Sequence, residues 1–315
     1  MMRFEQILVG VDLHHGDRMA TERLLPATQA AIDEAVWLSQ TTQATITLCA
    51  VLELSDQALY LMQQHEHLAP TVKDVAWRLL EQQAAALRQR GLKVQASLRF
   101  GRPWEELIRE ALQLEADMLL VGTRERGKTA RLLFGSTAQK LIRLAPLPVW
   151  VVKPAAVREV REIVVATDFS DNAQQALHHA VQLAQQLPCK VWLVHALEYP
   201  FESYLRTSGV SEADIQRHKQ RVLQEAEEHL QQQLRDTDAR TLTYGIRTQV
   251  LEGAADVVIP EFLVQTQADL LVMGTQGRSG LSGLLLGNTA ERMLVNLPCS
   301  LLAVKPPGFQ TPVTL

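Results

Sequence analysis

Length, composition and charge exclude several classes of protein. The chain has 315 residues, of which 47% are hydrophobic and 21% charged, which is typical of a globular protein with about two domains and not of a disordered one. The net charge of −4, the 5% of aromatic residues and three scattered cysteines argue against a nucleic-acid platform, a disulfide framework and a zinc ribbon. We expect a cytoplasmic protein without a signal peptide or a membrane span, because no stretch of ~18 residues is continuously apolar.

The first predicted strand, residues 7–11, is apolar and is followed by Asp12. A similar run at 163–167 is followed by Asp168, 156 residues later, so the second half of the chain repeats the first. Nearer the end of each half the offset is 152 residues, as between Gly122 and Gly274. The repeat predicts two domains, which span residues 1–156 and 157–315.

The first half carries an insertion between its first strand and first helix. The helix residues repeat at an offset of 145 and the strands at 156, so the insertion has 11 residues and lies between Leu13 and Gln29. It contains His14-His15-Gly16-Asp17 after the first strand, the place where adenylyl-transferring enzymes with a Rossmann-like fold carry a His-x-Gly-His signature. Because Asp17 replaces the final histidine, we favour a solvated loop over a catalytic segment.

The second half alternates short apolar runs with longer amphipathic stretches. The runs predict strands at 163–166, 191–196, 249–251, 270–273 and 300–304, and the stretches predict helices that include 174–187 and 218–234. Nearly continuous apolar runs are typical of parallel strands buried on both faces. We therefore expect an α/β fold with two tandem, doubly wound, parallel five-stranded sheets of Rossmann-like type.

Ligands of such sheets bind at the carboxyl ends of the strands, near the point where strand order reverses. In the second half these ends carry Asp168, Ala196 and the glycine-rich loop that runs from Gly274 to Thr289. Glycines let a backbone approach phosphate closely, and a carboxylate accepts hydrogen bonds from ribose hydroxyls. Alternatively, the loop is a plain turn, and Asp168 and Asn288 are helix N-caps.

The spacing in this loop resembles that of a known family. Gly274-x-x-Gly277, nine further residues and Gly287-Asn288, with Asp168 closing the first strand, resemble the nucleotide-binding pattern of the universal stress protein family, whose fold is adenine nucleotide alpha hydrolase-like. The resemblance covers both halves. It implies ATP or another adenine nucleotide as ligand, with Mg²⁺ as a candidate companion ion. The contacts it implies are those of Thr167, Asp168, Ala196, Met273, Gly274, Gly277, Arg278, Gly287, Asn288 and Thr289.

The first half departs from this pattern, because Glu125 stands where Gly277 stands in the second. A carboxylate there would repel phosphate, so we expect the stronger site in the second half. The residues that remain for a weaker second site are Asp12, Gly122, Arg126, Gly135, Ser136 and Thr137.

Other chemistry has little support in the sequence. His65-Glu66-His67 and His178-His179 lack further metal ligands at suitable spacing, so we expect no metal site and no catalytic residue. Three functions stay open: an adenine-nucleotide-binding regulator of stress adaptation, a slow ATPase or ATP-using transferase, and a ligand-free interaction scaffold. The apolar last strands, 149–152 and 301–304, predict a pseudo-twofold pair of domains within one chain, and a homodimer of the whole chain stays open.

Overall fold

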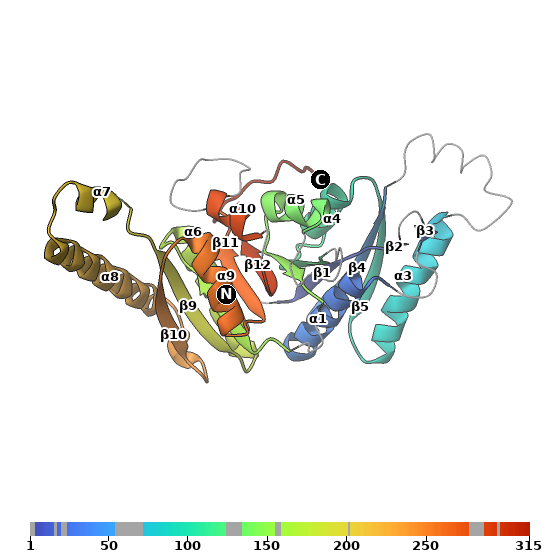
Figure 1. Cartoon of the computed structure of the whole chain (residues 1–315). Coiled ribbons are helices and arrows are strands. Elements are labelled where there is room, and N and C mark those ends of the chain that lie inside the picture. Colours follow the sequence, from blue (N-terminus) through green and yellow to red (C-terminus); the bar gives the residue numbers. More distant parts are fainter. Residues whose placement is uncertain are drawn as a thin grey trace. The chain divides into compact units, whose positions relative to one another are not determined.

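The chain forms two compact units, Met1–Glu159 with Phe309–Leu315, and Val160–Gly308 (Figure 1). This computed structural model describes residues 4–15, 18–19, 24–53, 72–123, 134–154, 159–200, 202–276, 287–294 and 297–315.

The first unit alternates strands and helices along the chain. Its described elements are β1 (Gln6–Val11), β2 (His14–His15), β3 (Arg18–Met19), α1 (Pro26–Thr42), β4 (Thr45–Leu52), α3 (Val72–Gln89), β5 (Val94–Phe100), α4 (Pro103–Gln113), β6 (Met118–Gly122), α5 (Ser136–Leu144) and β7 (Val149–Val152). The main strands lie in the order β7-β6-β1-β4-β5, with each neighbouring pair parallel.

The second unit repeats this arrangement. Its described elements are β8 (Glu162–Ala166), α6 (Asp171–Gln186), β9 (Lys190–Leu197), α7 (Glu202–Thr207), α8 (Glu212–Arg235), a 3-10 turn η1 (Ala239–Thr241), β10 (Ile246–Glu252), α9 (Ala255–Gln265), β11 (Leu270–Gly274), α10 (Asn288–Leu294) and β12 (Ser300–Val304). The strands lie in the order β10-β9-β8-β11-β12, again all parallel. The prediction of two tandem, doubly wound α/β units is confirmed, whereas their pairing about a pseudo-twofold axis stays a prediction.

The central strands are buried because helices cover both faces of each sheet. In β8, Ile163, Val164 and Val165 are fully buried, as are Leu270, Leu271 and Val272 in β11. Helix α6 packs on β8, β9 and β11, and α8 packs on β9 and β10. Helix α8 extends outward from the sheet with α7 near its far end (Figure 1). No helix in the described ranges combines the length and apolar character that crossing a membrane requires.

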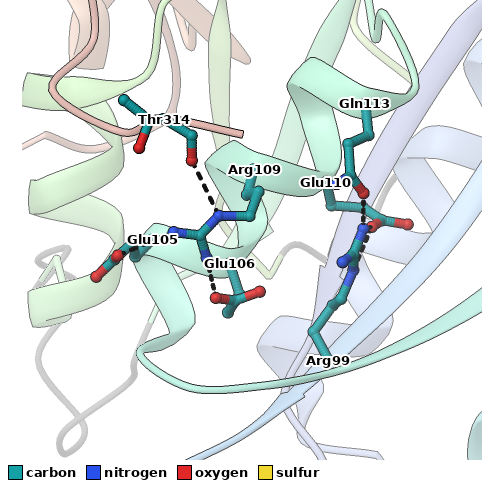
Figure 2. A network of polar contacts seen from close by, with 7 residues as sticks. All are labelled: Arg99, Glu105, Glu106, Arg109, Glu110, Gln113 and Thr314. Atoms are coloured by element: carbon teal, nitrogen blue, oxygen red, sulfur yellow. Dashed lines mark hydrogen bonds and ion pairs between the residues drawn. The ribbon is translucent and has the colours of Figure 1, made fainter.

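Two features of the first unit differ from the sequence-based expectation. The insertion is not only loop, because β2 and β3 pair as a short antiparallel ladder within it. Residues 309–315, which the sequence places in the second domain, group with the first unit. There Val313 is buried, and Arg109 on α4 donates from Nε to the carbonyl oxygen of Thr314 at 3.1 Å (Figure 2).

Candidate functional site

The candidate site lies where strand order reverses in the second unit. Strand β8 is flanked by β9 and β11, and Ala166 is paired with Met273 at their carboxyl ends. The chain continues from β8 to β9 on one side of β8 and later returns to its other side as β11. The connections that follow β8 and β11 therefore diverge at the carboxyl ends of these two strands. The turn after β8 and the loop after β11 therefore form the two walls of the site.

A four-residue turn, 167–170, joins β8 to α6. Ser170 is the N-cap of α6, and its hydroxyl oxygen accepts from the amide of Ala173 at 3.2 Å. Asp168 Oδ1 in turn accepts from the amide and the hydroxyl of Ser170, at 3.1 and 2.6 Å. The alternative in which Asp168 itself caps the helix is therefore wrong. One carboxylate oxygen of Asp168 is thus bonded to the capping residue, which fixes the Asp168 side chain beside the switch point.

Thr167 is directed into the fold. Its hydroxyl donates to Gln233 Oε1 on α8 at 2.8 Å and accepts from the amide of Phe169 at 2.9 Å. His195 at the end of β9 donates from Nδ1 to the carbonyl oxygen of Thr167 at 2.8 Å. Thr167 therefore holds the turn in place through its hydroxyl and carbonyl groups. Because its hydroxyl already makes two hydrogen bonds within the protein, it is not a free hydroxyl for a ligand.

Phe169 adopts a left-handed backbone conformation, with φ of 64°, which is uncommon for a bulky residue. Its ring lies 4.2 Å from that of His195 and 5.1 Å from that of His229 on α8, measured between centroids. This aromatic cluster offsets part of the cost of the strained turn.

The loop after β11 begins in close contact with α6. A Cβ atom on Gly274 would lie 2.7 Å from Nδ2 of Asn172, so only glycine fits there without displacing that side chain. Asn172 Nδ2 donates to the carbonyl oxygen of Gln276 at 3.1 Å. The amide of Thr275 donates to the carbonyl oxygen of Val304 at 2.9 Å, which ties the loop to β12.

The far end of the same loop returns to its beginning. The amide of Gly287 donates to the carbonyl oxygen of Thr275 at 3.0 Å, and α10 begins at Asn288. The predicted contacts of Gly277 and Arg278 lie outside the described residues, as do the side chains of Asn288 and Thr289. The described residues thus fix both roots of the loop.

The other predicted contacts flank this site. Ala196 lies near the end of β9 and is partly exposed, and Met273 is buried in β11 beside Ala166. Lys305, which directly follows β12, is also nearly buried, and this burial lowers its pKa to about 7. In the sequence, this titratable amine follows Val304, whose carbonyl oxygen accepts from the amide of Thr275.

The first unit places its counterparts at equivalent positions. Asp12 is partly exposed after β1, and Gly122 ends β6. Gly135 is the N-cap of α5, while Ser136 and Thr137 form the first turn of that helix. Arg126 and Glu125 lie outside the described residues.

Packing differs at the root of the first unit's loop. A Cβ on Gly122 would lie 2.2 Å from the carbonyl oxygen of Ala27, so the backbone of α1 itself fills the space that the Asn172 side chain fills in the second unit. Both glycines therefore allow the first helix of their unit to pack closely on the strand, Gly122 against the backbone of Ala27 and Gly274 against the side chain of Asn172.

Two other features involve none of the predicted nucleotide contacts in the described ranges. An open groove of about 750 Å³ runs between α8 and β10, lined by residues that include His229, Arg235 and Thr248, and none of the predicted nucleotide contacts lines it. Among the residues that the structure describes, no three His, Cys, Asp or Glu side chains gather as a metal site. His178 and His179 lie on α6, and His65-Glu66-His67 lies outside the described residues.

Asn172, Ser170 and Gln233 are the site residues that sequence reasoning missed. The offset of 145 residues between α1 and α6 aligns Asn172 with Ala27. This difference between the two halves, a polar residue in place of an alanine, was the available signal for Asn172. No comparable signal marks Gln233, whose partner Thr167 is 66 residues away in the chain.

Comparison with known proteins agrees with this architecture. The profile of the universal stress protein family matches twice, at residues 3–153 and 159–305. Universal stress protein E of Photorhabdus laumondii is 28% identical over 99% of this chain and 98% of its own length, and that of Escherichia coli K12 is 27% identical over 100% and 98%.

Solved structures agree at the level of the fold. A universal stress protein from Archaeoglobus fulgidus has a TM-score of 0.66 at 18% identity, covering 96% of this chain and 98% of that one. A putative universal stress protein from Pseudomonas aeruginosa has a TM-score of 0.63 at 20% identity, covering 96% and 94%. With both halves of the chain matched by the family profile, the protein belongs to the universal stress protein family.

Proposed function

We propose that the second unit binds an adenine nucleotide at the switch point and that the protein acts in the cytoplasm as a regulator in stress adaptation. The observation that carries the proposal is the junction of the two connections: the turn that fixes Asp168 leads into α6, and α6 is joined to the loop that begins at Gly274 by the hydrogen bond from Asn172 to Gln276. A carboxylate and a glycine-rich backbone loop at one strand edge suit ribose and phosphate, respectively.

The described residues fit such a ligand. Asp168 lies on a short turn whose cap holds its Oδ1, and the residue is partly exposed. Gly274 has no side chain to obstruct the loop root, and Gly287 returns the chain to Thr275. We propose that Asp168 binds the ribose hydroxyls and that the backbone between Gly274 and Gly287 binds the phosphates, with Mg²⁺ as a companion of ATP.

The first unit is proposed to bind such a ligand weakly or not at all. Glu125 occupies the sequence position of Gly277, so phosphate would meet a like charge there. Ala27 at the position of Asn172 also supplies no polar side chain. One strong site per chain follows.

Calorimetric titration of the nucleotide-free chain with ATP, ADP and AMP tests this proposal. We expect a stoichiometry near one. Asp168→Ala should weaken binding by about 10- to 150-fold, the effect of losing a charge-assisted hydrogen bond. Two equal sites, or no binding of any adenylate by the unmodified chain, would contradict the proposal.

A matched variant separates binding from folding. Asp168→Asn keeps an oxygen that accepts from Ser170 but removes the charge, so it should weaken nucleotide binding and leave the melting temperature nearly unchanged. Asp12→Ala, the equivalent change in the first unit, should leave the affinity unchanged. Gly277→Glu should abolish binding, and Glu125→Gly should strengthen binding to the first unit.

The proposal of a regulator rather than a catalyst has its own test. Release of inorganic phosphate from ATP should be far slower than the turnover of an ordinary enzyme, for which about 1 s⁻¹ is a low value. Turnover at or above that rate, lost in Asp168→Ala, would favour the ATPase alternative.

A further inference from the structure

We infer that Asn172 is a positioning residue for the phosphate end of the candidate site, and that its absence from the first unit contributes to the difference between the two units. The inference rests on the proposed nucleotide site and concerns a residue outside the set of predicted ligand contacts. Asn172 is the second residue of α6, and its side chain is 4% exposed. It is therefore part of the packed wall of the site and not a solvent-facing polar residue.

The contacts of Asn172 connect the start of α6, directly after the turn, to the loop after β11. Nδ2 donates to the carbonyl oxygen of Gln276, 104 positions away in the chain, and the same amide group packs on the bare Cα of Gly274. Because a carbonyl oxygen only accepts, the group that faces it must be the amide nitrogen, which fixes the orientation of the side chain. The amide oxygen Oδ1 is buried and has no hydrogen-bond partner among the described residues.

This arrangement sets where the loop starts. Gln276 is the last described residue before Gly277, the first glycine of the predicted phosphate loop after Gly274. One root of the loop is held by Asn172 through Gln276, and the other by Thr275 through the amide of Gly287. A loop whose ends are already fixed loses less conformational freedom when it binds a ligand.

The first unit lacks this device. Ala27 stands at the equivalent position, also as the second residue of its helix, and a methyl group cannot donate a hydrogen bond. There the helix backbone contacts Gly122 directly. The same glycine contact thus packs the helix in both units, whereas, among the residues that the structure describes, the hydrogen bond from the second helix position to the loop occurs in the second unit.

The inference predicts a split between ligands. Asn172 acts on the phosphate side, so Asn172→Ala should weaken ATP binding by about 3- to 10-fold, as expected for one neutral hydrogen bond, and leave adenosine binding unchanged. A merely structural role would weaken both ligands in proportion. Titration calorimetry of the full chain with adenosine, AMP and ATP measures the ratio directly.

Gln174→Ala is the matched control, because Gln174 lies on the same helix and also donates an amide hydrogen to a carbonyl oxygen, that of Gln233 at 3.2 Å. It should leave the ratio of ATP to adenosine affinity unchanged. If Asn172→Ala does not fold, Asn172→Ser, whose shorter side chain cannot reach Gln276 in the same way, should give the same split.

The outcomes separate the two proposals. An unchanged ratio in a folded Asn172 variant that still binds ATP would overturn the positioning role and leave the nucleotide site standing. Failure of the unmodified chain to bind either adenosine or ATP would overturn the proposed function, and the inference with it. Loss of adenosine and ATP binding to the same degree would also overturn the positioning role.

Discussion

The two units share one order of strands but differ in how the first strand connects to the first helix. In the second unit four residues, 167–170, lead from β8 into α6, and Ser170 caps that helix. In the first unit residues 12–25 make the same connection, and α1 begins after Leu25 without a side-chain cap, with Pro26 in its first position. The two units thus share the order of strands but differ in the connection at the strand ends, where a ligand would bind.

The difference shows which parts of this fold are constrained. The helices must cover the sheet in both units, and both therefore keep a glycine where the first helix crosses the strand. Connections between strands and helices can change in length and polarity at little cost to the core. A function that depends on these connections can therefore be present in one unit and weak in the other.

The glycine pair allows the largest test of the comparison. Gly122→Ala would place Cβ 2.2 Å from a backbone oxygen, so the first unit should lose about 3 kcal/mol or more of its free energy of unfolding. Gly274→Ala meets the tip of Asn172 at 2.7 Å and should cost about 1–2 kcal/mol. Urea denaturation of both variants measures the difference. Equal losses would show that the two crossings are not packed differently.

Helix α6 adds a response to acid that α1 is not expected to share. Burial, with a smaller contribution from the charge of His178, lowers the pKa of His179 to about 4, and its Nδ1 has no hydrogen-bond partner among the described residues. The unfolded chain therefore binds a proton near pH 6.5 that the folded chain binds only near pH 4. Stability should fall as pH drops through this window, by roughly 3 kcal/mol in total.

The variant His179→Gln should flatten this acid response. Thermal melts of the second unit's transition between pH 4 and 7.5 measure it, with His178→Gln as the neighbouring control. His178 lies on the same turn and is bonded through Nε2 to the carbonyl oxygen of Asp236. An acid response that persists unchanged in His179→Gln would assign it to other groups.

The capped turn separates stability from binding. Ser170→Ala removes the cap of α6 and the hydroxyl that donates to Asp168, so it should cost about 1 kcal/mol of stability and also weaken nucleotide binding. Ser211→Ala removes the corresponding cap of α8, where Ser211 accepts from the amide of Asp214. It should lower stability alone. Chemical denaturation and titration calorimetry on both variants distinguish the two effects.

The smallest expected effect concerns the last residues of the chain. Arg109 pairs with Glu105 and Glu106 on its own helix and donates to Thr314, as Figure 2 shows. Arg109→Ala should loosen residues 311–315 by about 0.5–1 kcal/mol. Hydrogen exchange at the amide of Val313 measures this. Gln113 lies on the same helix and accepts a hydrogen bond from Arg99 on β5, so Gln113→Ala is the control and should leave the exchange unchanged.

Much of the fold could be predicted from the sequence. Apolar runs such as 163–166 and 270–273 coincide with β8 and β11 to within one residue at each end, because strands buried on both faces tolerate few polar residues. The pair β2 and β3 was missed, since two-residue strands leave no periodic signal.

The candidate site was predictable in position but not in detail. Asp168 and Gly274 could be placed at neighbouring strand ends because the order of strands in such sheets is restricted. The roles of their neighbours could not, because Thr167 with Gln233 and Asn172 with Gln276 are pairs from distant parts of the chain.

The sequence by itself determined the two repeated units, the alternation of strands and helices, and the difference between Glu125 and Gly277. These depend on local composition and spacing, which a single chain displays directly. Only the tertiary structure decided that Asp168 braces Ser170 instead of capping the helix and that Asn172 tethers Gln276. Hydrogen bonds of this kind depend on the direction of individual side chains after packing, and no periodicity in the sequence encodes that direction.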